Sequence, residues 1–76
     1  MVTFDGHNYE SMEDIPDIGS WECVEAIGNK RKYWGMSADV DKLPKYDDMG
    51  TGSEALCLDT GDVYGYHAHT KQWHKL

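Results

Sequence analysis

The stretch that decides the fold is the last part of the chain, Glu54-Ala-Leu-Cys-Leu-Asp-Thr-Gly-Asp-Val-Tyr-Gly-Tyr-His-Ala-His-Thr-Lys-Gln-Trp-His-Lys-Leu76. Two turn signals, Asp59 to Asp62 and Ala68 to Lys71, divide it into three short segments. Gly61 supplies the left-handed backbone conformation that the first turn requires. The stretch therefore predicts a compact antiparallel meander, and it carries no catalytic signature.

Alternation along these segments predicts which side chains are buried. Side chains of a strand point to its two faces in turn, so Leu56 and Leu58 share one face while Ala55 and Cys57 share the other. The simplest arrangement turns the two leucines inward. The predicted core is then Leu56, Leu58, Tyr64, Tyr66 and Trp73, packed against Trp21, Val24 and Val40.

Two further hairpins are predicted upstream of the meander. Residues 2–9 alternate around Asp5-Gly6, a pair that favours the positive φ angles of a tight hairpin turn. Trp21 to Ile27 is the first long strand, and Lys30 to Trp34 returns after the turn signal Gly28-Asn29. The basic cluster at that turn is expected to pair with glutamates across the hairpin.

Short helical turns complete the predicted fold. Ser11 is a candidate N-cap for residues 12–15, which end at Pro16, and Ser37 is a candidate N-cap for residues 38–43, which end at Pro44. Residues 45–53 contain two glycines and predict a mobile surface loop. The prediction is one small domain spanning residues 1–76, mainly β, a small antiparallel sheet or meander with one or two short helical turns.

Charge is distributed unevenly along this acidic chain. The net charge is −7, and residues 1–29 contain seven carboxylates but no Lys or Arg. Such a field repels nucleic acid and anionic membrane and attracts basic surfaces. We therefore expect a protein partner, with no nucleic acid and no membrane. The acidic segment is either a solvated surface or a face for a basic partner.

The two cysteines, Cys23 and Cys57, are too few for a disulfide scaffold. The first residues lack the basic region and apolar run of a signal peptide, and no apolar run approaches the roughly 20 residues that span a bilayer. Free thiols in a reducing cytosol are expected. A bridge between the two cysteines is the alternative.

Several side chains are of types that can form chemical sites. His67, His69 and His74 lie within eight residues, but their spacing matches no zinc motif, and His69 falls in a turn. Cys57 lies between two leucines, where an inert thiol is usual. The carboxylates at 39, 41, 47 and 48 have no evident cleft. We expect no catalytic residue, no metal, no cofactor and no enzymatic activity.

Aromatic and methionine side chains around the 45–53 loop are the candidate partner-binding residues. Not all of them fit into so small a core, and such residues are enriched at protein interfaces. The alternative is that they complete the core. The candidates are Tyr33, Trp34, Met36, Tyr46 and Met49.

The segment Leu56-Cys-Leu-Asp-Thr-Gly-Asp-Val-Tyr-Gly-Tyr66, followed by Thr70-Lys-Gln-Trp73, resembles small accessory proteins of tailed bacteriophages and prophages of Gram-positive bacteria. Those proteins end in a strand, an Asp-Thr-Gly turn, a Val-Tyr-x-Tyr strand, a Thr-Lys turn and a Trp-bearing strand. Ser37 to Pro44 and Tyr9 to Pro16 are also similar to this group. The likeness is strongest over residues 54–76.

The resemblance implies a non-enzymatic protein, expected to be a minor virion component that binds other virion subunits or itself. Its location would be the virion or the bacterial host cytoplasm. The alternative is an acidic inhibitor made during infection, whose first third occupies a basic nucleic-acid-binding surface of a host protein.

Overall fold

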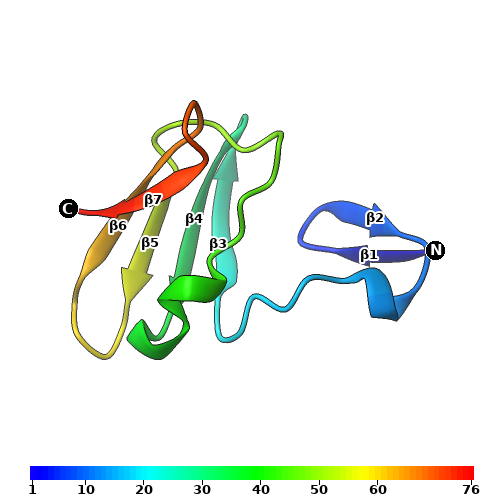
Figure 1. Cartoon of the computed structure of the whole chain (residues 1–76), viewed down its shortest axis with the longest axis horizontal. Coiled ribbons are helices and arrows are strands. Elements are labelled where there is room, and N and C mark those ends of the chain that lie inside the picture. The colour runs from blue at the N-terminus through cyan, green and yellow to red at the C-terminus, as the bar shows by residue number, and fades with distance from the viewer.

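The structure is a computed structural model that describes residues 1–76, and it is mainly β, as the sequence predicts. The strands are β1 (Val2–Phe4), β2 (His7–Tyr9), β3 (Glu22–Ile27), β4 (Lys30–Gly35), β5 (Glu54–Cys57), β6 (Val63–His67) and β7 (Gln72–Lys75). Two 3-10 helices, η1 (Met12–Asp14) and η2 (Ser37–Lys42), lie between them. β1 and β2 form a hairpin beside a five-stranded sheet in which β3 to β7 follow one another in chain order (Figure 1).

The large sheet is antiparallel except between β4 and β5, which run parallel. A parallel pair needs a crossover connection, and η2 together with residues 43–53 provides it. Figure 1 shows η2 at the end of the sheet where β4 ends. The predicted meander is confirmed in β5, β6 and β7. The parallel pair differs from the all-antiparallel expectation because the chain crosses back to the start of β4 before it pairs again.

The predicted hairpin over residues 2–9 is confirmed. Val2 lies opposite Tyr9 and Phe4 lies opposite His7. Asp5 has a φ of 51° and Gly6 a φ of 78°, the positive pair that a two-residue type I′ turn requires. The Asp-Gly dipeptide therefore determines this turn locally.

The predicted N-cap position is confirmed for Ser11, although without a capping hydrogen bond from its side chain, and it is wrong for Ser37, because Met36 is the N-cap of η2. The Ser11 hydroxyl donates to Asp14 Oδ2 at 3.2 Å and makes no hydrogen bond to the backbone of η1. η2 begins at Ser37 itself, whose hydroxyl donates to Asp59 Oδ2 at 2.7 Å. In both serines the hydroxyl hydrogen is donated to a carboxylate, and the hydroxyl oxygen accepts no backbone N–H of the helix. Neither helix has the length and apolar character that crossing a membrane would require.

The core lies on one face of the large sheet. It consists of Ile18, Trp21, Tyr33, Leu43, Met49, Ala55, Cys57 and Tyr66. Two predicted core residues, Trp21 and Tyr66, are confirmed. Three others, Val40, Tyr64 and Trp73, are partly buried against this cluster.

The predicted inward face of β5 is wrong. Ala55 and Cys57 are completely buried, whereas Leu58 is 51% exposed. The register explains this result, because Ala55 lies beside Tyr33 on β4 and therefore faces the side that the rest of the chain covers. Val24 is also exposed rather than buried, at a register shift in the edge strand β3.

Residues 45–53 lie against the sheet instead of forming a peripheral loop. Met49 is 2% exposed and Ser53 is fully buried. The Ser53 hydroxyl accepts a hydrogen bond from the Arg31 N–H at 3.0 Å and donates to the Gly50 carbonyl at 2.9 Å. The Gly50 N–H donates in turn to the Asn29 carbonyl at 2.7 Å. This segment covers one end of the core and satisfies backbone groups that have no strand partner there.

A polar clamp (Asp5, His7, Arg31, Tyr33 and Asp48) attaches the hairpin to β4. The Tyr33 hydroxyl donates to Asp5 Oδ2 at 2.8 Å, and Arg31 Nη1 donates to the Asp5 carbonyl at 2.8 Å. Arg31 Nη1 also lies 3.4 Å from Asp5 Oδ2, with both side chains largely buried. Burial raises the pKa of the Tyr33 phenol, so it stays a hydrogen-bond donor.

His7 extends the clamp to the crossover segment. Its Nδ1 lies 3.0 Å from the Asp5 carbonyl and its Nε2 lies 2.9 Å from Asp48 Oδ1. Both partners are acceptors, so only the doubly protonated imidazole donates to both. The hydrogen bond from His7 lowers the pKa of the Asp48 carboxyl. The Tyr46 ring stacks on His7, with ring centroids 4.2 Å apart.

Gly35 is a position where packing forbids a side chain, and its substitution is the first test of the fold. A Cβ at Gly35 would lie 2.5 Å from Trp21 Cε3 in the core. We expect Gly35→Ala to lower the free energy of unfolding by about 1–3 kcal/mol through overpacking, measured by urea denaturation. The control is Gly65→Ala, where the nearest atom is the terminal Leu76 Cδ2 at 3.3 Å and a change within about 0.5 kcal/mol is expected. Equal losses in both variants would contradict the role of the Trp21 contact.

Acid should destabilise the fold through carboxylates with lowered pKa values. The Ser37 hydroxyl and backbone N–H lower the pKa of Asp59, and His7 lowers that of Asp48. A carboxylate with a lower pKa in the folded state contributes stability above its unfolded pKa, and this contribution is lost as the pH falls through the folded value. We expect the urea midpoint to fall progressively below about pH 4. In Asp59→Asn the fall should be smaller; an unchanged pH profile would exclude Asp59 as a contributor.

Candidate functional site

The large sheet has one covered face and one open face. Burial alternates along the central strands: Tyr33 and Gly35 on β4 are buried while Lys32 and Trp34 are exposed. On β5, Ala55 and Cys57 are buried, Leu56 is partly buried and Glu54 is exposed. We call the second face the open face; its central residues are Glu25, Lys32, Trp34, Glu54, Leu56 and Val63.

A row of large side chains crosses the open face. Trp34 lies beside Leu56 on the parallel strand, and Leu56 lies beside Val63 on β6. Trp34 is 45% exposed, which is high for the largest side chain of all. Met36 and Leu58 follow the ends of β4 and β5 and are also exposed, and the Leu58 N–H donates to the Gly35 carbonyl at 2.8 Å. The apolar row therefore continues beyond the strands.

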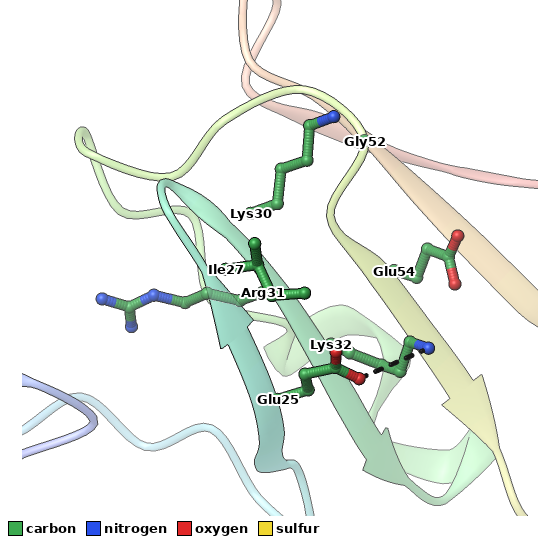
Figure 2. Close-up of a pocket in the computed structure, with 7 residues that line it drawn as sticks. All are labelled: Glu25, Ile27, Lys30, Arg31, Lys32, Gly52 and Glu54. Atoms are coloured by element: carbon green, nitrogen blue, oxygen red, sulfur yellow. Dashed lines mark ion pairs between the residues drawn. The ribbon is translucent and has the colours of Figure 1, made fainter.

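Beside this row lies a shallow charged hollow of about 310 Å³. Its lining residues are Glu25, Ile27, Lys30, Arg31, Lys32, Gly52 and Glu54. Figure 2 shows the Arg31 side chain pointing away from the others, toward the hairpin side, where it belongs to the polar clamp. The side chains that remain on the open face come from three neighbouring strands and the segment before β5.

Apart from Arg31, the hollow holds two carboxylates and two lysines, and one residue of each kind is unpaired. Lys32 Nζ lies 3.9 Å from Glu25 Oε2, an exposed and weak pair. This pair confirms part of the predicted cross-hairpin pairing, although the predicted partner Glu22 lies opposite Trp34 instead. Lys30 and Glu54 form no ion pair within the chain. No Ser, Thr, Cys or His lines the hollow, so its groups are suited to binding charged and polar surfaces.

The five predicted partner-binding residues do not form one patch. Trp34 and Met36 are exposed and can be contacted. Tyr33 and Met49 are wrong as contact residues because both are buried in the core. Tyr46 is partly buried under the hairpin, and its ring also lies 5.3 Å from the Arg31 guanidinium. The two residues that remain available lie on or next to the open face.

The cysteines and histidines considered as candidate chemical groups are buried, unpaired or hydrogen-bonded locally. Cys57 is buried, and burial raises the pKa of its thiol; it is free, as is the exposed Cys23. His67 Nδ1 bonds to Thr70 Oγ1 at 2.9 Å. No three His, Cys, Asp or Glu side chains come together as a metal-binding group.

Sequence reasoning missed the charged residues of the open face as a site. Lys32 and Glu54 are far apart in the sequence and become neighbours only through the parallel pairing of β4 and β5. The sequence signal available was their strand alternation, which places each one residue from a buried side chain. Comparisons with protein-family models, curated proteins and solved structures gave no match to this chain.

The assignment of Met49 to the core and of Met36 to the surface can be tested by replacing each with alanine. We expect Met49→Ala to lower the free energy of unfolding by about 2–5 kcal/mol, because it opens a cavity in the core. Met36→Ala, with an exposed side chain, should change it by no more than about 0.5 kcal/mol. Thermal and urea denaturation of both variants provide the measurement. A Met49→Ala protein as stable as Met36→Ala would restore Met49 as a contact candidate.

Proposed function

We propose that this chain is a non-enzymatic accessory protein of a tailed bacteriophage or prophage, a minor virion component that binds protein through its open face. The observation that carries the proposal is the uncovered row containing Trp34. A tryptophan left about half exposed beside other apolar side chains is costly in water and is typical of protein interfaces. The resemblance of residues 54–76 to phage accessory proteins supplies the biological setting, in the virion or the bacterial host cytoplasm.

The open face supports protein docking better than small-molecule binding. The hollow is shallow, has balanced charge and is lined by one apolar residue, whereas small-molecule sites are concave and mostly apolar. A flat sheet face with an apolar row and flanking charges matches the apolar centre and polar rim of a protein interface. Virion subunits or another copy of this chain are the proposed partners, with no nucleic acid and no membrane.

A second candidate function is inhibition of a host protein through the acidic first third. Six of its seven carboxylates are exposed, and only Asp5 is held in the polar clamp. This surface would occupy a basic nucleic-acid-binding surface of the host protein. Its affinity would fall steeply with salt, since exposed charges are screened beyond about 10 Å at 0.1 M. Binding through the Trp34 row would change little with salt.

The test is mass spectrometry of purified particles and of proteins captured by the tagged chain from induced source cells. We expect the chain in the particles, and portal, capsid or tail subunits among the captured proteins. Trp34→Ser should reduce their capture at least about tenfold, because an interface tryptophan often contributes more than about 1.4 kcal/mol.

Met12→Ser is the matched control, since Met12 is an exposed apolar side chain on η1 and its loss should leave capture unchanged. Particles that lack the chain would overturn the virion proposal. Capture of a host nuclease or polymerase that weakens with salt and survives Trp34→Ser would favour the inhibitor instead.

A further inference from the structure

We infer that the partner of the open face is a second copy of this chain, packed face to face in a two-fold symmetric dimer. The inference rests on the proposed function, because it assigns the partner of the same face. It follows from the arrangement of complementary residues on β4 and β5. The two strands run parallel and side by side at the centre of the sheet, with two strands or fewer on either side.

The parallel register places complementary side chains next to one another. Lys32 on β4 lies beside Glu54 on β5, and Trp34 lies beside Leu56. We place the two-fold axis midway between the two facing sheets, parallel to the strands and above the line that separates β4 from β5. This axis brings each β4 over the β5 of the second copy. Lys32 then meets Glu54 of the second copy and Trp34 meets Leu56 of the second copy. Because the contact is isologous, each of these pairs occurs twice.

The neighbouring strands are compatible with this arrangement. The same register row continues from Lys32 to Glu25 on β3 and from Glu54 to Gly65 on β6. The axis therefore places Glu25 over Gly65 of the second copy, beside the Leu76 side chain and His74, where no like charge opposes it. The strand directions of two packed sheets differ by about 30° because each sheet is twisted. This rotation displaces the outer strands most and leaves the β4 and β5 contacts near the axis.

The size of the face predicts a weak dimer. Five strands at a spacing of about 4.8 Å, each with roughly five residues at about 3.4 Å, give a footprint of roughly 400 Å² per copy. The relief of the side chains above the backbone increases the buried area, but it brings it at most to about 800 Å² per partner, the size of a standard stable interface. We therefore expect a dissociation constant in the micromolar range.

The experiment is sedimentation equilibrium of the full chain between roughly 10 µM and 1 mM, with charge-reversed variants. We expect the wild type to dimerise. Lys32→Glu and Glu54→Lys should each weaken self-association at least about tenfold, because each places like charges opposite one another twice. An equimolar mixture of the two variants should regain the dimer, since both charged contacts across the axis then join a glutamate of one variant to a lysine of the other.

Matched controls carry the same charge changes away from the open face. Lys45→Glu and Glu13→Lys change exposed side chains that form no ion pair, and they should dimerise as the wild type does. Dimer formation should also shift the Trp34 emission to shorter wavelength, because the other two tryptophans are already buried or partly buried. Trp34→Ala should remove both the shift and the dimer.

Three results would overturn the dimer: a wild-type chain that stays monomeric at the highest concentration, charge reversals that leave association unchanged, or a mixture that fails to restore it. A monomer that still captures virion subunits through Trp34 would overturn the dimer and keep the proposed function. A dimer that captures none and is missing from particles would keep the dimer and overturn the virion role.

Discussion

The rest of the structure depends on the Asp5 carboxylate, held between the Arg31 guanidinium and the Tyr33 hydroxyl. Asp5 is in the hairpin turn, and its two partners are alternate residues of β4. A charge this well buried is stable only when its partners are in place. The contact therefore ties the register of β4 to the position of the hairpin, and Tyr33 at the centre of the core ties both to the covered face of the sheet.

With one face of β4 committed to the core, the other face follows from strand geometry. The hairpin, η2 and the crossover segment all lie on the covered side of the sheet or at its end. Lys32 and Trp34 are therefore left in solvent, and the parallel partner β5 contributes Glu54 and Leu56 beside them. The open face is thus the side of the sheet opposite the clamp, and its complementary pattern arises from the parallel register.

The proposed binding role and the proposed dimer draw on the same surface but on different properties of it. The binding role needs only an uncovered apolar row, with Trp34 as its largest member. The dimer needs the pairing of that row with Lys32 and Glu54 around an axis. Self-association would bury the apolar row and would add to the stability of a domain whose own core is small. A second copy and a virion subunit would compete for this surface, because the dimer buries the same apolar row.

The sequence by itself determined the features that depend on neighbouring residues: the Asp5-Gly6 turn, the mainly β class, and the meander of residues 54–76 with its turns. Only the tertiary structure decided which face of β5 is inward, that residues 45–53 enter the core, and that Trp34 rather than Tyr33 is available to a partner. Leu56 and Leu58 are more hydrophobic than Ala55 and Cys57, so side-chain hydrophobicity alone predicted that the leucine face of β5 would be buried. The small pair is buried because Tyr33 and Met49 already fill the space beside them, and that packing depends on contacts distant in the sequence, which alternation does not encode.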